Sequence, residues 1–223
     1  MAALSVAVAK NLSTIRARIA DAGVDPQRIT IVGVTKGFGP DAVRAAADAG
    51  LCDLGENYAQ ELIAKVSAVE GESLRWHFLG PIQRNKVALL APVVAVWQAV
   101  DRRAAGEAIA RRAPGAHVLV QVNISGETTK HGCAPAEVPA LVDDLRTLGL
   151  SVTGLMAIGP SGPPELARPG FRAVVELSRQ LALPEVSIGM TEDLEVAVEE
   201  GATMVRIGRG LFGPRPGTSR LRR

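Results

Sequence analysis

Short apolar segments alternate with amphipathic segments along most of the chain. The first segment places Leu4, Val8, Leu12, Ile15 and Ile19 at helical spacing, which predicts a leading amphipathic helix over residues 1–22. After it, the apolar segments carry β-branched residues on both faces, as parallel strands covered on both sides do. The predicted strands are 28–36, 51–57, 75–82, 93–100, 117–124, 151–159, 185–190 and 203–210.

Each predicted strand is followed by a helix or a helical turn. The predicted helices are 40–50, 59–69, 84–91, 102–113, 136–149 (which Pro139 is expected to kink or delay), 171–183 and 191–202. Strict alternation without a polar linker favours a single α/β domain over residues 1–223. Eight units favour a closed (β/α)8 TIM barrel, and the count leaves an open doubly wound sheet as the alternative.

The composition narrows the class of protein. No apolar run reaches the roughly 18–20 residues that a membrane-spanning helix needs, and the first residues lack the features of a signal peptide. We therefore expect a cytoplasmic protein without a membrane partner. A net charge of +2 and 3% aromatic residues also argue against a nucleic-acid partner.

Neither the basic C-terminal residues nor the two cysteines are expected to form a functional site. Residues 214–223 form a basic tail interrupted by proline and glycine, which predicts a solvated terminus rather than a binding arm. Cys52 and Cys133 lie far apart without a metal-ligand pattern, so we expect two buried thiols and no metal site.

Lys36 is the first candidate for chemistry, because it ends the first predicted strand. By the two-residue period of a strand it shares a face with Thr30, Val32 and Val34, and it can point into the mouth of a barrel. An ammonium group there is costly unless it is paired or its pKa falls, and a neutral amine attacks aldehydes. The alternative is a loop lysine that reaches solvent.

The last two predicted strands end in groups suited to an anion. Arg206 and Gly208 are expected to face the lumen, where the guanidinium must find either an ion pair or a ligand. The sequence GRG (208–210) exposes backbone N–H donors, and Thr191 is expected to cap the following helix or to contact a phosphate. An amine beside such a cradle suits a phosphorylated aldehyde.

The sequence leaves two interpretations open for Asn57 and for His77. Asn57 contacts a ring substituent or stabilises a turn, and His77 is either a core histidine or a base. Lys130 and His131 lie in a polar loop that overhangs the predicted mouth, where Lys130 is a weaker candidate for a second cofactor site.

Six ordered segments together carry a resemblance to a known family. They are VTKGF, GENYAQE, WHFLGPIQRNK, VQVNISGETTKHGC, GLMAIG and SIGMTEDLEVAVEEGATMVRIGRGLFG, and they span about residues 28 to 213. They closely resemble the pyridoxal phosphate homeostasis protein family (YggS/PROSC type). The resemblance implies a single barrel similar to the N-terminal domain of alanine racemase, which is fold type III of the enzymes that use pyridoxal 5′-phosphate (PLP).

The resemblance also implies roles for residues. Lys36 would carry PLP as a Schiff base, Arg206 would face the pyridine nitrogen, and the phosphate would lie between Thr191, Gly208 and the amide of Arg209. The implied neighbours of the cofactor are Asn57, His77, Ser187 and Met190. Two departures are Arg209, where the family usually has threonine, and the pair Gly37-Phe38 after the lysine, where a polar pair is commoner.

The function implied is a monomeric, non-catalytic PLP binder in vitamin B6 homeostasis, with apo PLP-dependent enzymes as candidate recipients. The first alternative is a racemase-like enzyme. It needs a second base, and the only tyrosine of the chain is Tyr58, in the loop after the second predicted strand. The second alternative is a Schiff-base aldolase acting on a sugar phosphate without a cofactor.

Overall fold

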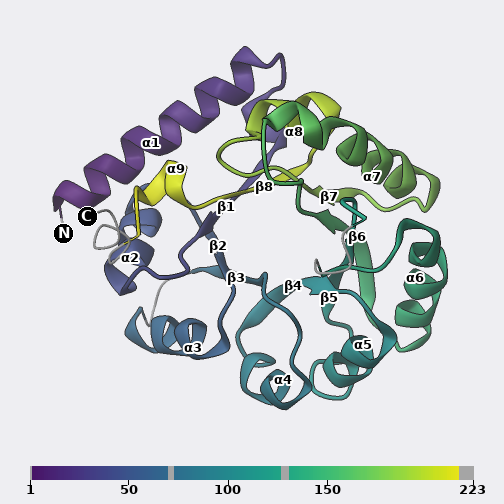
Figure 1. Cartoon of the computed structure of the whole chain (residues 1–223). Coiled ribbons are helices and arrows are strands. Elements are labelled where there is room, and N and C mark those ends of the chain that lie inside the picture. Colours follow the sequence, from purple (N-terminus) through teal and green to yellow (C-terminus); the bar gives the residue numbers. More distant parts are fainter. Residues whose placement is uncertain (1, 70–72, 127–130, 216–223) are drawn as a thin grey trace, which may run out of the picture.

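Eight parallel strands close into a barrel in the order of the chain, and β1 pairs with β8 (Figure 1). The computed structural model describes residues 2–69, 73–126 and 131–215. The strands are β1 (Thr30–Val34), β2 (Asp53–Glu56), β3 (Arg75–Phe78), β4 (Val94–Val100), β5 (His117–Val122), β6 (Ser151–Ala157), β7 (Glu185–Ser187) and β8 (Met204–Ile207). All lie within the predicted ranges, so the predicted barrel is confirmed and the open sheet is not.

Helices surround the barrel on its outer side (Figure 1). They are α1 (Ala2–Asp21), α2 (Pro40–Asp48), α3 (Ala59–Ala68), α4 (Arg84–Leu90), α5 (Arg103–Ala110), α6 (Val138–Thr147), α7 (Arg168–Gln180), α8 (Leu194–Glu200) and α9 (Arg209–Phe212), with 3-10 turns at Pro26–Arg28, Pro135–Glu137 and Pro164–Ala167. Pro139 lies in the first turn of α6 and therefore delays this helix instead of kinking it. Pro169 similarly allows α7 to start before the predicted residue 171.

Helix α1 lies outside the βα repeat and packs beside α2, α8 and α9 (Figure 1). Its predicted apolar face is buried through Val8, Leu12, Ile15 and Ile19. The Asn11 side chain donates to the carbonyl of Leu211 at 2.8 Å. The leading helix is thus attached to the last helix described, on the side where β8 ends.

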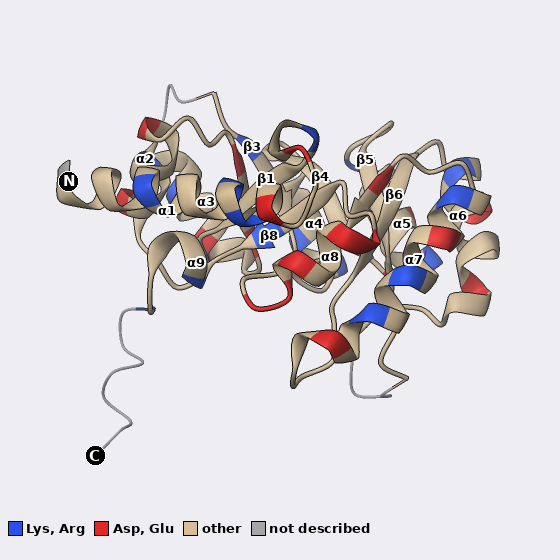
Figure 2. Cartoon of the chain, turned by 90° about the horizontal axis from the view of Figure 1, so that it is seen from above, with Lys and Arg blue, Asp and Glu red and all other residues tan. Residues whose placement is uncertain are grey.

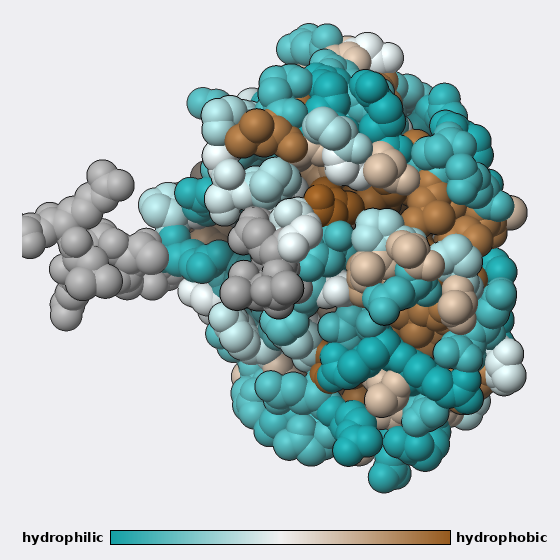
Figure 3. Space-filling view, turned by 45° about the vertical axis from the view of Figure 1, so that its right-hand side comes forward, coloured by the Kyte–Doolittle hydropathy of each residue, from teal (hydrophilic) through white to brown (hydrophobic). Residues whose placement is uncertain are grey.

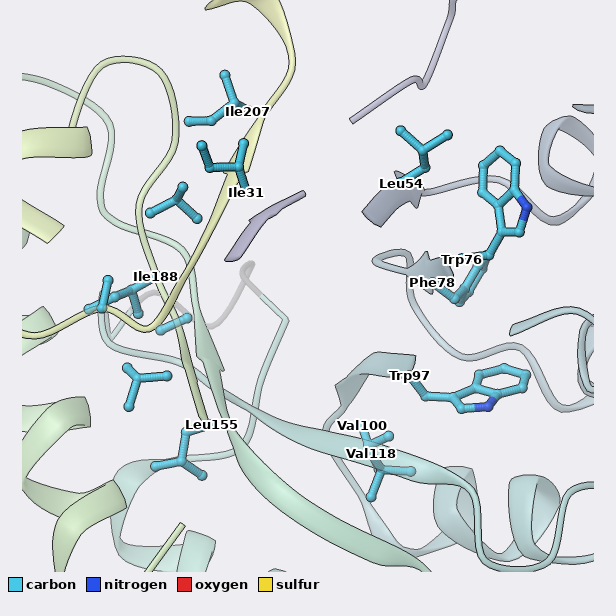
Figure 4. Packing of buried hydrophobic residues seen from close by; sticks show 14 of the residues in the cluster. Ile31, Leu54, Trp76, Phe78, Trp97, Val100, Val118, Leu155, Ile188 and Ile207 are labelled. Carbon is cyan, nitrogen blue, oxygen red and sulfur yellow. The ribbon is translucent and has the colours of Figure 1, made fainter. Parts of the chain in front are cut away.

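The main core lies between the strands and the helices (Figure 4). Ile31 and Ile207 belong to this layer, whereas Val32 and Arg206 alternate with them and face the barrel interior. The interior holds a small apolar cluster of Val96, Ala99, Leu119 and Met156. It also holds buried polar residues, which include His77, Gln98, Gln121, Ser187 and Arg206.

The surface carries both signs of charge, which are interspersed along α6 and α7, whereas the charged residues of α8 are all acidic (Figure 2). Arg168, for example, pairs with Glu165 and Glu199. The face over α6 and α7 is mainly hydrophilic, with hydrophobic residues in smaller patches (Figure 3). Within the described part of the chain, no helix combines the length and apolar character needed to span a membrane.

Cys133 is buried as predicted, but the prediction for Cys52 is wrong, because this thiol is exposed just ahead of β2. Most of the basic tail, residues 216–223, lies outside the described residues, as does Lys130.

Candidate functional site

A cavity opens at the carboxyl end of the strands, where sites of this fold are found. Its lining residues are Val34, Lys36, Asn57, Leu79, Met156, Ile158, Met190, Thr191, Glu192, Arg206, Gly208, Arg209 and Arg215. Seven of the nine residues predicted to lie near a cofactor are in this list, and His77 and Ser187 are the exceptions. The closed barrel therefore gathers residues from widely separated segments into one cavity.

Lys36 follows β1 closely and is followed by Gly37, whose φ of 75° favours glycine. Burial lowers the pKa of Lys36, the positive charges of Arg215 and Arg206 lower it further, and Glu56 partly opposes this shift. Its ammonium nitrogen makes no hydrogen bond or ion pair with the residues that the structure describes. A larger share of this amine is therefore neutral, and nucleophilic, than of an ordinary lysine.

A buried ion pair supports the loop that carries Lys36. Lys65 pairs with Glu56, and its Nζ atom donates to the carbonyl of Thr35 at 2.7 Å. The second carboxylate oxygen of Glu56 accepts from the amide of Asn57 at 2.8 Å. One pair therefore fixes the residues that precede Lys36 and the turn that carries Asn57.

Sequence reasoning missed Lys65. The available signal was its position on the apolar stripe of α3, three residues after Leu62 and four after Glu61. Glu61 adds a second hold on the loop, because its carboxylate accepts from the amide of Gly37 at 2.8 Å. Next to it, Phe38 packs on Phe212 with ring centroids 5.5 Å apart, so the unusual Gly37-Phe38 pair joins the loop to α9.

Arg206 is 5% exposed and is held without a carboxylate partner among the described residues. Its Nη1 atom donates to the carbonyl and the hydroxyl of Ser187 at 2.6 and 2.7 Å, and its Nη2 atom donates to the carbonyl of Ala157 at 2.8 Å. Burial lowers the pKa of Arg206 to about 10, with a partial opposing effect of Asp193. These bonds use three of the five N–H groups of a guanidinium. Two donors therefore remain for a ligand in the cavity.

The loops after β7 and β8 meet at Thr191. The Thr191 hydroxyl accepts from the amide of Gly210 at 3.2 Å, and the Thr191 carbonyl accepts from Arg18 of α1 at 2.9 Å. The prediction that Thr191 caps the next helix is wrong, because α8 begins at Leu194 after Asp193. The Asp193 carboxylate instead accepts from the amide of Met190 at 2.6 Å and closes the turn in which Thr191 faces the other loop.

Arg209 begins α9, and its side chain donates to Glu192 at 2.7 Å with both groups exposed at the rim. The charge of Arg209 is therefore directed to a carboxylate of the neighbouring loop. Arg215 adds another cation to the lining, which sequence reasoning missed because the whole basic tail was interpreted as solvated. The one signal that Arg215 lies near the cavity was its position two residues after Gly213, at the end of the last family-like segment.

Asn57 carries an unusual polar atom. Its Oδ1 atom is buried and has no hydrogen-bond partner in the described structure. The backbones of Asn57 and Gly80 pack closely against each other. A Cβ added at Gly80 would lie only 2.0 Å from the Asn57 carbonyl oxygen, so the backbone of Asn57 cannot shift easily. An unpaired buried acceptor in a cavity is costly unless a ligand donates to it.

Two predicted candidates lie apart from the cavity. His77 is buried inside the barrel, where its ring nitrogens bond to Asp53 at 2.9 Å and Gln98 at 2.7 Å. Its direct contact with a cofactor therefore stays a prediction. His131 lines a different cavity with Arg84 and Arg102, and the structure does not describe the neighbouring Lys130.

Comparisons of the sequence with a family model and with known proteins identify relatives of this chain. The family model for the alanine racemase N-terminal domain matches residues 5–216. The chain is 40% identical over 220 residues to the pyridoxal phosphate homeostasis protein of Pseudomonas aeruginosa, covering 93% of this chain and 96% of that one. It is 34% identical over 232 residues to the protein of the same name from Escherichia coli, covering 93% and 97%.

Solved structures agree with this placement. PipY of Synechococcus elongatus, solved with PLP bound, superposes with a TM-score of 0.81 at 31% identity, covering 92% of this chain and all of that one. Alanine racemase of Clostridium difficile superposes with a TM-score of 0.74 at 15% identity, covering 94% of this chain and 58% of the enzyme. The second likeness shows the fold alone.

Proposed function

Since the chain belongs to the pyridoxal phosphate homeostasis protein family, we propose that it binds PLP through Lys36 as a Schiff base and holds this vitamin B6 cofactor for apo-enzymes in the cytoplasm. The observation that carries the proposal is the half-buried Lys36 amine, which shares one cavity with the donors of Arg206 and the loops that meet at Thr191. The PLP-bound structure of PipY supports it.

Formation of the Schiff base depends on the protonation state of Lys36. The neutral Nζ atom of Lys36 attacks the aldehyde carbon, a C=N bond forms, and the aldehyde oxygen leaves as water with the two amine hydrogens. The lowered pKa of Lys36 favours this step, because only the neutral amine has a free electron pair. The reaction is reversible with water, which allows the cofactor to be released again.

The other residues of the cavity fit the remaining groups of PLP. We assign the phosphate to the Thr191 hydroxyl and the backbone of Gly208 and Arg209, with Met190 beside it. Asn57 Oδ1 is suited to accept from the ring hydroxyl, which would satisfy its unpaired buried oxygen. One of the two remaining N–H groups of Arg206 is suited to donate to the pyridine nitrogen, which has a single lone pair.

Arg206 favours holding the cofactor over using it. A guanidinium only donates hydrogen bonds, so it stabilises a pyridine nitrogen that carries no proton. An unprotonated ring is a weak electron sink, and PLP-dependent chemistry at an amino acid depends on that sink. The site therefore supports binding without catalysis.

The residues of the cavity also lack a suitable second base for racemisation. Beside Lys36 and the arginines, the described lining offers only Glu192, which is paired with Arg209. Tyr58 is 58% exposed and is not part of the lining. We therefore favour the carrier over the racemase-like enzyme.

The test is to add PLP to the protein, reduce it with borohydride and locate the pyridoxyl group by mass spectrometry. We expect one adduct on Lys36, a visible absorbance band that disappears in Lys36→Ala, and transfer of unreduced PLP to an apo-enzyme. Lys10→Ala on the exposed face of α1 is the matched control and should load normally. Absence of the adduct, or normal loading of Lys36→Ala, would contradict the proposal.

We further propose that residues 1–223 act as one unit and that the protein is a monomer. Size-exclusion chromatography with light scattering, with and without PLP, tests this directly. The expected mass is that of one chain, 23.3 kDa.

A further inference from the structure

A chain of hydrogen-bonded side chains crosses the barrel interior below the cavity. Its successive members are Arg206, Ser187, Gln98, His77 and Asp53, with bonded atoms 2.7, 2.7, 2.7 and 2.9 Å apart. They belong to β8, β7, β4, β3 and β2, so the chain joins strands around the barrel. Asp53 is the first residue of β2 and lines a separate cavity at the opposite end of the strands. The cavity that holds Lys36 is thus linked to the far end of the barrel.

The direction of the bonds is fixed at the Arg206 end. A guanidinium has donors and no acceptor, so the Ser187 hydroxyl oxygen must accept from Arg206. The hydroxyl hydrogen of Ser187 is then directed to the Oε1 atom of Gln98. This assigns the oxygen of the Gln98 amide to the side of Ser187.

A second residue fixes the same orientation independently. The Nε2 atom of Gln98 lies 3.0 Å from the sulfur of Met204, which can only accept. The amide nitrogen therefore faces Met204 and His77, and the Nδ1 atom of His77 is an acceptor. The single ring proton of His77 then belongs on Nε2, where it is donated to the Asp53 carboxylate.

We propose that Gln98 is a positioning residue for Arg206 and that the chain it completes sets the orientation of the guanidinium toward the bound cofactor. This inference rests on the proposed function, because it concerns the ring end of the same site. Every bond in the chain donates away from the cavity and toward the carboxylate of Asp53. Such aligned bonds strengthen one another in a dry interior, so the Ser187 oxygen becomes a better acceptor for Arg206.

Gln98 is the member that joins the two ends of the chain. Without its amide, the Ser187 hydroxyl loses its acceptor and the Nδ1 atom of His77 loses its donor. Arg206 then keeps the carbonyls of Ser187 and Ala157 but faces a hydroxyl free to rotate. We expect the two remaining donors of Arg206 to be less well aligned with a ring nitrogen.

The test combines an observation on the protein without PLP with a binding measurement. In ¹⁵N NMR spectra, the Nδ1 atom of His77 should show the shift of a hydrogen-bonded acceptor in the wild type and in Lys36→Ala, and should lose it in Gln98→Leu, while Asp53 keeps the ring proton on Nε2. The Kd for PLP should rise roughly tenfold in Gln98→Leu, with a shift of the visible band of the bound cofactor. Ser187→Ala should weaken PLP binding by a similar factor yet keep the ¹⁵N shift of His77 Nδ1, because the Gln98–His77 bond stays intact.

Gln121→Leu is the matched control, because Gln121 is also a buried glutamine and bonds to the His131 carbonyl instead of the chain. It should change neither the ¹⁵N shift of His77 Nδ1 nor the Kd. An Nδ1–H tautomer in the wild type, or wild-type PLP binding in a folded Gln98→Leu, would overturn the inference. If the wild type takes no PLP, the proposed function fails, while the tautomer still reports on the chain itself.

Discussion

Lys65 and Glu56 form an ion pair with only 4% and 0% of their side chains exposed. The pair lies beneath the loop of Lys36, where Lys65 also donates to the Thr35 carbonyl. Water cannot compensate either charge at this depth, so each depends on the other. The loop that carries Lys36 therefore depends on a pair of charges that are almost completely buried.

We predict that Lys65→Met lowers the free energy of unfolding by about 3–5 kcal/mol, because it leaves the Glu56 carboxylate buried without its partner. Urea denaturation followed by circular dichroism measures this loss. Adding Glu56→Gln should recover part of it, since no charge then remains buried. Arg179→Ala removes an exposed ion pair with Glu176 and should cost no more than about 1 kcal/mol. Equal losses in the two single variants would refute the role of the buried pair.

The pH dependence of PLP binding should respond to Arg215. Burial is the main cause of the lowered pKa of Lys36, and the Arg215 cation is the next. Arg215→Gln removes a charge that disfavours the ammonium form, so the pKa of Lys36 should rise without reaching that of a free lysine. The rate of Schiff-base formation, followed by absorbance, should then reach half its maximum at a higher pH than in the wild type. Arg172→Gln on α7 should leave the profile in place, and an unshifted profile in Arg215→Gln would count against this coupling.

Helix α1 should affect the phosphate end of the site from outside the barrel. Arg18 donates to the Thr191 carbonyl and pairs with Glu195, so Arg18→Ala frees the turn that presents the Thr191 hydroxyl. We expect the Kd for PLP to rise roughly three- to tenfold, as loss of a charge-assisted hydrogen bond allows. Pyridoxal, which lacks the phosphate, should bind as it does to the wild type in spectroscopic titrations. Lys10→Ala is the control on the same helix, and an equal effect on both ligands would argue for a general loss of structure.

Close backbone approach should make Gly80 irreplaceable. A Cβ there would lie 2.0 Å from the Asn57 carbonyl oxygen, whereas a Cβ at Gly39 would meet nothing within 4 Å. Gly80→Ala should therefore lower the free energy of unfolding by about 1–3 kcal/mol and weaken PLP binding through displacement of Asn57. Gly39→Ala should leave stability nearly unchanged in thermal unfolding. A fully stable Gly80→Ala with normal PLP binding would be inconsistent with this contact.

The two thiols should differ in reactivity. Burial raises the pKa of Cys133 to about 11, so almost no thiolate forms at pH 8, whereas Cys52 is exposed. Iodoacetamide should therefore label the folded protein once, at Cys52, and should label both thiols only in denaturant. Peptide mass spectrometry identifies the site, and rapid labelling of Cys133 in the folded protein would contradict its burial.

Much of the fold could be predicted because hydrophobic periodicity is a local property. The strand period correctly predicted that Arg206 faces inward, and its neighbour Ile207 packs against the helices. The same rule brought Lys36 to the mouth of the barrel. These positions follow from the backbone alone once the alternation of strands and helices is recognised.

The errors arose where partners distant in sequence compete for a side chain. Thr191 has the chemistry of a helix cap, but its hydroxyl is used by Gly210, nineteen residues later. Lys65 has an ordinary place on a helix, and only the folded barrel brings it to Glu56 and Thr35. Periodicity cannot indicate such contacts, because they depend on which strands become neighbours.

The pairing of β1 with β8 has a consequence for the timing of synthesis. Lys36 is synthesised well before β8, the strand that closes the barrel beside β1, because β8 comes more than 160 residues later. At roughly 5–20 residues per second, the 168 residues from Lys36 to Met204 take about 8–34 s to make. Through most of that interval α1 lacks the carbonyls of Thr191 and Leu211 that it binds in the finished protein. A nascent chain therefore carries Lys36 before the residues proposed to hold the phosphate have been made, and the proposed site can form only after β8 has been added.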